Sequence, residues 1–357
     1  MDGQDRTMGE ALDKPARAVH AEAGQRRRAL HRPVLYSLGA AVVLLGANLV
    51  WSFVLAETPP ALLPPAGEVM GGTAPFTFAV VGDSRGNTTV FEEILSRIRA
   101  DGASLILHGG DIVRRAKPRQ FDWVLHELAE ENLAVPFCPV PGNHDIDEAV
   151  DDPGGRCRLY SRAFGPRRYW FAYANTLFVA FDTATKRCSA DDLAWLDGTL
   201  ARYRGGYDAC FVYMHVPPVD PRPDRWREVQ EGKEELARIL KEHDVTAVFA
   251  SHIHSYVEGS VEGIPLFISG GAGARLEGPG DRYHYLLCTV EPGGSFAVRK
   301  IDVGDRPDAD YPEYALRVKF PARGMLVTGV GLVLAAFAVS LFAGAGPAHK
   351  ERRTPRT

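Results

Sequence analysis

The central part of this 357-residue chain lacks the surplus of basic residues that a nucleic-acid binder needs. Residues 1–33 and 325–357 together hold 11 of the 41 Lys and Arg but only 6 of the 45 Asp and Glu. Residues 34–324 therefore carry 30 basic and 39 acidic residues, a net charge of −9. Because phosphate backbones are bound through basic surfaces, we expect no nucleic-acid partner.

Cysteine is also scarce, with five residues in the chain. Cys138, Cys210 and Cys288 lie inside apolar runs of strand-like composition, which predicts buried thiols. Cys157 and Cys188 lie in polar segments, and a disulfide between them is a hypothesis that fits an oxidising compartment. No cysteine stands among the polar residues that follow the predicted strands, which argues against a structural zinc site.

Two long runs, residues 34–56 and 325–345, lack charged residues altogether. About 20 apolar residues are enough to cross a bilayer as a helix, so each run is predicted to be a transmembrane helix. Arginines at 26–32 precede the first run, and Lys and Arg at 350–356 follow the second. The positive-inside rule then places both termini in the cytoplasm and the intervening domain outside it. A cleaved signal peptide is the alternative for the first run, although 33 residues precede it.

Between the two runs, short apolar segments alternate with amphipathic ones. Continuous apolar character predicts strands that are buried on both faces, whereas apolar residues spaced three and four apart predict helices. The pattern indicates an α/β fold of two packed sheets with an antiparallel end. The predicted organisation is a basic tail (1–33), a span (34–56), a Pro/Gly linker (57–74), a folded domain (75–303), a connector (304–324), a span (325–345) and a second basic tail (346–357).

Polar residues follow one predicted strand after another. Since the carboxyl ends of strands in α/β sheets share an edge, we expect these residues to meet at a single sheet rim. Carboxylate and amide oxygens with imidazole nitrogens suit Mn, Fe or Zn. Each residue alone has a simpler explanation as a cap, a turn or a solvated residue, but the ordered set indicates a metal site. The set comprises Asp83, Asp111, Asn143, His144, His215, His252 and His254.

The segments that hold these residues read GDSRG, HGGDIV, PGNHD, MHVPP and SHIH. They resemble the five metal-binding blocks of the calcineurin-like metallophosphoesterases, and SGGAGA at 269–274 is similar to the end of many bacterial members. The resemblance covers residues 76–302 and implies a four-layer αββα sandwich of two mixed sheets, here flanked by the two predicted transmembrane helices. It also implies two divalent or trivalent metal ions, such as Mn, Fe or Zn.

The resemblance implies a role for each residue. Asp111 would bridge both ions, and His144 would protonate the leaving group while a metal-activated hydroxide attacks phosphorus. Either Asp111 or Asp145 would orient His144. Asn143, His215 and His252 would complete the coordination of one ion, and Asp83 and His254 would bind the other.

Arg85 departs from the family pattern, in which its position is a metal-ligating His. Arginine stays protonated and cannot ligate a cation. Purple acid phosphatases have a Tyr three residues after the bridging Asp, but here that residue is Arg114. The first metal site is then completed by water or Asn87, or it is weak or empty, or the chain is inactive. We favour the first alternative, and we expect Arg85 to bind a phosphate group of the substrate. The simpler explanation for Arg85 is a structural salt bridge to an acidic residue.

The sequence therefore predicts a membrane-anchored, outward-facing, metal-dependent phosphoesterase with His144 and Arg85 as catalytic residues. A phosphorylated small molecule or a lipid-linked phosphate is the expected substrate, and no protein partner is indicated. A non-catalytic or one-metal binding domain is the alternative, which Arg85 favours and His144 disfavours. Loops 147–165 and 216–228 are expected to select among mono-, di- and pyrophosphate esters.

Overall fold

The computed structural model describes residues 36, 39, 64–305 and 314. The predicted spans and both predicted tails lie outside the described residues, except for Tyr36 and Gly39. Among the residues that are described, no helix has both the length and the apolar character needed to cross a membrane. Ala56–Val318 forms one compact unit, which contains the predicted folded domain.

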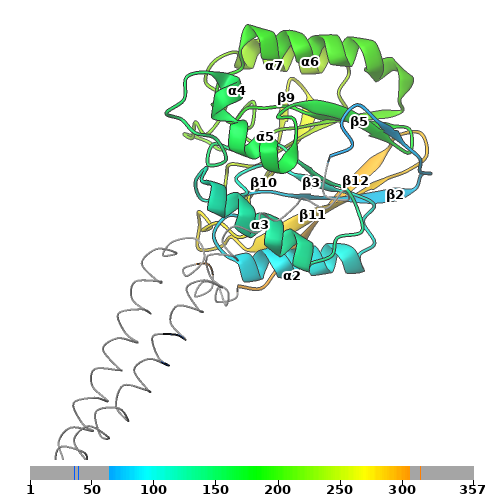
Figure 1. Ribbon diagram of the computed structural model, residues 1–357. Helices are drawn as coiled ribbons and strands as arrows, with labels where there is room; N and C mark the ends of the chain where they lie inside the picture. Colours follow the sequence, from blue (N-terminus) through cyan, green and yellow to red (C-terminus); the bar gives the residue numbers. More distant parts are fainter. Residues whose placement is uncertain (1–35, 37–38, 40–63, 306–313, 315–357) are drawn as a thin grey trace, which may run out of the picture. The chain divides into compact units, whose positions relative to one another are not determined.

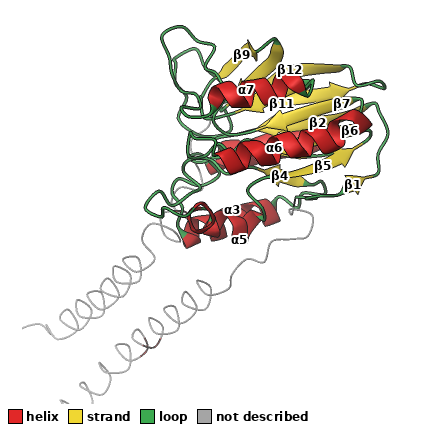
Figure 2. Ribbon diagram, turned by 90° about the horizontal axis from the view of Figure 1, so that it is seen from above, coloured by secondary structure: helices red, strands yellow, loops and turns green. Residues whose placement is uncertain are grey.

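Two mixed sheets lie at the centre of this unit, as Figure 2 shows. The seven-stranded sheet has the order β1-β5-β6-β7-β8-β10-β9, and the five-stranded sheet has the order β12-β11-β2-β3-β4. Both contain parallel and antiparallel pairs, which confirms the predicted α/β fold of two mixed sheets. The first sheet comprises β1 (Val69–Met70), β5 (Tyr169–Tyr173), β6 (Thr176–Ala180), β7 (Ala209–Tyr213), β8 (Ala247–Ala250), β9 (Tyr256–Val261) and β10 (Ile264–Ser269). The second comprises β2 (Phe76–Val81), β3 (Ile106–His108), β4 (Phe137–Pro139), β11 (Tyr283–Val290) and β12 (Phe296–Val303).

Helices cover the outer face of each sheet (Figure 1). Two of them, α6 (Ala190–Tyr203) and α7 (Lys233–Glu242), pack on the seven-stranded sheet, and α2 (Thr88–Ala100), α3 (Pro118–Glu130) and α5 (Arg158–Phe164) pack on the five-stranded one. The helix α6 is capped at its N-terminus, because the Ser189 hydroxyl accepts a hydrogen bond from the backbone N–H of Asp192 at 3.1 Å. Two short elements complete the set, α4 (Pro153–Arg156) and the 3₁₀ helix η2 (Arg204–Gly206).

Three apolar cores hold these layers together. Two cores lie between a sheet and its helices, and the third lies between the two sheets. The middle core is rich in phenylalanine, and the Phe211 ring lies 5.2–5.7 Å from four other phenylalanine rings. A fully buried side chain of this size stabilises the fold by roughly 1.5–3 kcal/mol, so this core fixes the two sheets against each other.

Two segments differ from the sequence-based expectation. The predicted linker contains β1, which pairs with β5 and so belongs to the sheet. The loop predicted over 147–165 contains the helices α4 and α5. The antiparallel end is as expected: β9, which follows SHIH, pairs antiparallel with β10, and β11 pairs antiparallel with β12 and β2.

The proposed disulfide between Cys157 and Cys188 is wrong. All five cysteines lie among the described residues, and each is a buried free thiol. Cys157 packs with Ile146 and Ala184, whereas Cys188 belongs to the core beneath α6 and α7. Because the two thiols fill different apolar clusters, they contribute packing, not a cross-link.

Candidate metal centre

The predicted site residues follow the carboxyl ends of strands in both sheets. Asp83, Asp111 and Asn143 follow β2, β3 and β4 of the five-stranded sheet, while His215 and His252 follow β7 and β8 of the seven-stranded sheet. The expectation of a single sheet rim is therefore wrong. The two sheets pack face to face, so their rims lie next to each other and together form the site.

Hydrogen bonds join the two rims directly. The Nδ1 atom of His215 lies 2.8 Å from the Gly109 carbonyl oxygen, and the backbone N–H of His252 donates to Asp83 Oδ2 at 2.8 Å. The Gly-rich segment after β10 also reaches across, because Ala274 N–H donates to the Asp83 carbonyl at 2.8 Å. A side chain at Gly270 would place its Cβ 2.7 Å from Asp83 Oδ2, so glycine is required there.

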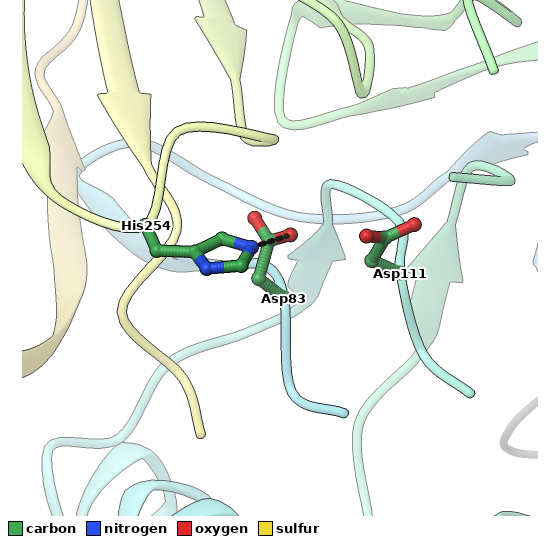
Figure 3. A group of neighbouring side chains, drawn as sticks. All are labelled: Asp83, Asp111 and His254. Carbon is green, nitrogen blue, oxygen red and sulfur yellow. Dashed lines mark ion pairs between the residues drawn. The ribbon is translucent and has the colours of Figure 1, made fainter. Parts of the chain in front are cut away.

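Asp83, Asp111 and His254 form a first cluster of potential ligands (Figure 3). Their ligand atoms all lie within 4.8 Å of one another. Because the Nδ1 atom of His254 is 2.8 Å from the Arg275 carbonyl, it must be the protonated nitrogen, and Nε2 faces Asp83 Oδ1 at 3.3 Å. The three residues together could bind a cation.

Asp111, Asn143, His215 and His252 form a second cluster. Since His215 donates from Nδ1 to a carbonyl, its Nε2 atom carries a lone pair when the ring is neutral. That atom lies 3.1 Å from Asn143 Oδ1, 3.2 Å from His252 Nδ1 and 3.4 Å from Asp111 Oδ1. Lone pairs on nitrogen and oxygen thus face one another, and a cation between them would turn this repulsion into coordination.

One buried atom supports this interpretation. Among the described residues, Asp83 Oδ1 is buried without a hydrogen-bond partner. Buried polar atoms are nearly always paired, so an unpaired carboxylate oxygen needs an explanation. This oxygen is a metal-ligand atom, and the donor set of oxygen and imidazole fits the transition metals that the sequence indicates.

The protonation states of the second cluster are those of metal ligands. Burial raises the pKa of Asp111, but the neighbouring His215 and Arg85 lower it more, to about 2, so the carboxylate is charged. Burial lowers the pKa of His252 to about 2, so this ring is neutral and offers a lone pair. In the first cluster, burial lowers the pKa of His254, but the neighbouring Asp83 carboxylate raises it above the normal value.

His144 lies beside both clusters and is held by a backbone group. Its Nδ1 atom is 2.8 Å from the Arg114 carbonyl, and its Nε2 atom is 3.9 Å from Asp111 Oδ2. Asp145, a predicted candidate for orienting this ring, is not its partner. The Asp145 carboxylate instead accepts hydrogen bonds from the backbone N–H groups of Ile112, Val113 and Gly142. It therefore holds together the two loops that follow β3 and β4. The Arg114 carbonyl fixes which nitrogen of His144 faces the site.

Arg85 contacts both carboxylate and imidazole groups of the first cluster. Its Nε atom donates to Asp111 Oδ2 at 2.8 Å, and its Nη2 atom is 3.3 Å from His254 Nε2. Asn87, a predicted substitute ligand, accepts the Val90 N–H instead and caps α2. The side chain of Arg85 is 20% exposed, so its outer N–H groups remain accessible to a substrate.

Two residues to which the sequence assigned no role support these loops. His108 is fully buried and links Ser84 Oγ to the backbone N–H of Gly110. Ser251 donates to the Ser269 carbonyl at 2.9 Å. The HGGD and SHIH motifs contain both residues, but they carry no ligand role that would have indicated them.

Comparison with known proteins gives the family of this chain. The family described as calcineurin-like phosphoesterase matches residues 76–256. Purple acid phosphatase 21 of Arabidopsis thaliana is 26% identical over 197 residues, which are 51% of this chain and 44% of that protein. The match thus spans less than half the length of this relative.

Two solved structures share the fold. A purple acid phosphatase from yellow lupin (Lupinus luteus) seeds covers 66% of this chain and 53% of its own, with a TM-score of 0.55 and 16% identity. A dimetal phosphatase from Danio rerio covers 65% of this chain and 98% of its own, with a TM-score of 0.50 and 14% identity. Because the family match covers half of the chain, this protein belongs to the calcineurin-like phosphoesterase family.

Proposed function

We propose that this chain hydrolyses phosphate esters in a metal-dependent reaction. The observation that carries the proposal is that His144 lies against Asp111 of the second cluster: its backbone N–H donates to Asp111 Oδ1 at 2.8 Å, and its ring Nε2 lies 3.9 Å from Asp111 Oδ2. A group able to donate a proton is thereby fixed next to a group of ligands. A domain that only bound metal would have no use for that arrangement.

Asp111, Asn143, His215 and His252 would hold a metal ion, which lowers the pKa of water and stabilises charge on phosphoryl oxygens when bound. The chain's own residues do the rest. Because the Arg114 carbonyl accepts a hydrogen bond from Nδ1, Nε2 of His144 faces the site, and the protonated ring would donate its Nε2 proton to the leaving oxygen and become neutral. Arg85 offers its outer N–H groups to the phosphoryl oxygens as a planar, charged donor.

The loop over 216–228 supports an anionic substrate. Arg222 is bonded to Asp220 and Glu277, whereas Arg227 shares that same Glu277 and keeps a side chain that is 37% exposed. Burial lowers the pKa of Arg227, and the charge of Asp83 opposes this change, so the guanidinium interacts electrostatically with a carboxylate of the first cluster. We propose that Arg227 contacts the phosphate of a small-molecule or lipid-linked substrate.

We also propose a two-pass membrane location with the domain outside the cytoplasm. The support is the absence of charge from residues 34–56 and 325–345 and the basic residues that flank them. Fusion of a reporter enzyme that is active on only one side of the membrane to residue 304 would test it. A cytoplasmic signal from that fusion would contradict this part of the proposal.

The reaction is tested on the purified full chain with aryl and alkyl phosphate esters and added Mn, Zn or Fe. We expect activity that a chelator abolishes. His144→Ala should lower kcat by about 10²–10⁴-fold for alkyl esters, whose leaving groups need a proton, and less for nitrophenyl esters. His243→Ala, a histidine that pairs with Asp197 away from the site, is the matched control. Inactivity with every metal and ester would favour a binding domain instead.

A further inference from the structure

The guanidinium of Arg85 lies between two atoms that a metal ion in the first cluster would need. Arg85 Nε donates to Asp111 Oδ2 at 2.8 Å, and Nη2 lies 3.3 Å from His254 Nε2. Since His254 donates from Nδ1 to the Arg275 carbonyl, its neutral ring has only the Nε2 lone pair to offer. A lone pair that accepts a hydrogen bond from Arg85 is not available to a metal.

Arg85 is held in place by its backbone. Its N–H donates to the Asp111 carbonyl at 3.2 Å, and the carbonyl of the next residue, Gly86, accepts from the Arg114 side chain. Gly86 itself has a φ of +133°, and a Cβ there would lie 2.8 Å from the Gly273 carbonyl. The loop is therefore packed on both sides, and its backbone holds the Cα of Arg85 beside the first cluster.

Charge balance favours the same conclusion. The two clusters together contain two carboxylates, Asp83 and Asp111, and Asp111 belongs to both. One divalent ion and one guanidinium already exceed the charge of two carboxylates. A second divalent ion would have to sit beside a permanent cation that cannot lose its proton.

We propose that Arg85 is the permanent cation of the first cluster, and that the chain binds one metal ion, in the second cluster, instead of two. The inference rests on the proposed metal centre and specifies its composition. The chain then resembles a dimetal site in which a side chain has replaced one ion. Asp111 bridges the guanidinium and the metal ion as it would bridge two ions.

The test is the number of metal ions per chain. The full chain is stripped with a chelator, saturated with Mn²⁺, freed of excess ion and analysed by elemental analysis and by electron paramagnetic resonance. We expect one ion per chain with the six-line spectrum of an isolated Mn²⁺. Arg85→His removes the permanent charge and supplies an imidazole, so it should bind two ions and show a spin-coupled spectrum. Arg85→Lys keeps the charge and should stay at one ion.

Two ions in the unaltered chain would overturn the inference, whether or not any variant folds. One ion in a folded Arg85→His chain would also overturn it. An active unaltered chain with two ions would leave the proposed function intact. A chain that binds no metal and is inactive would overturn both the one-metal inference and the proposed function. The activity assay with Zn and Fe would show whether the chain is inactive with every metal.

Discussion

His108 should make the stability of the domain depend on pH. The ring is fully buried at the end of β3, between the rings of Phe91 and Phe137. Gly110 N–H donates to Nδ1 at 3.1 Å, so that nitrogen must carry a lone pair and Nε2 must donate to Ser84 Oγ. Protonation would place an N–H against the Gly110 N–H. Burial, aided by the charge of His215, lowers the pKa of His108 to about 3.

The sign of the effect follows from this depressed pKa. Below its normal value of 6.5 the unfolded chain binds a proton that the folded chain excludes, so acid favours unfolding. Each pH unit between 6.5 and 3 then costs about 1.4 kcal/mol, and the loss from pH 6.5 to pH 5 is about 2 kcal/mol. His284, which is also buried with a lowered pKa, adds a loss of the same sign.

The measurement is urea unfolding followed by tryptophan fluorescence at pH 8, 6.5 and 5, with chelator present so that metal binding does not contribute. His108→Gln should be less stable than the unaltered chain at pH 8, and the difference should shrink by about 2 kcal/mol at pH 5. His126→Gln, on the outer side of α3 beside Glu130, is the control for losing a histidine. If the unaltered chain and His108→Gln lost stability in parallel, the proposed protonation state of His108 would be refuted.

Three further predictions concern packing and covalent state. Gly142→Ala should lower kcat/KM by about 100-fold, because its Cβ would lie 2.2 Å from Asp111 N and displace that ligand; unchanged kinetics would contradict the geometry. Phe211→Ala should reduce the free energy of unfolding by about 3–5 kcal/mol in urea titrations, since the ring lies fully buried between the sheets, and a loss below about 1 kcal/mol would be inconsistent with that position. Thiol titration in denaturant should give five thiols with or without reductant, and three thiols without reductant would indicate a disulfide.

Much of the fold could be predicted because its strands are continuous apolar runs and its helices have apolar residues along one face. The sequence pattern of α2, with apolar residues three and four apart, matches its buried face. The pairing between strands was harder to predict from the sequence, because it depends on contacts between segments that are far apart along the chain. The strand β9 alternates partly exposed residues and pairs only with β10, and β1 has two residues, so neither has a strong local pattern.

The site shows a similar division. The places of the candidate site residues after strands could be predicted, since motif order and strand position are properties of the sequence. The partner of His144 was not, because it is the carbonyl of Arg114, and every residue has a carbonyl. The position of Arg85 between Asp111 and His254 was also hidden, since a guanidinium can reach several acids and only the fold selects among them.

The backbone at three candidate ligands is strained. Asp83, Asp111 and His252 have φ values of 56°, 57° and 68°, in the left-handed region that side chains other than glycine rarely adopt. Such residues cost of order 1–3 kcal/mol each, and this cost persists only where the surroundings enforce it. Two hydrogen bonds enforce it here, because the backbone N–H of His252 donates to Asp83 Oδ2 and the backbone N–H of His144 donates to Asp111 Oδ1. Strained candidate ligands that hold one another, with an unpaired oxygen on Asp83, destabilise the fold, and a preformed cation site would account for them.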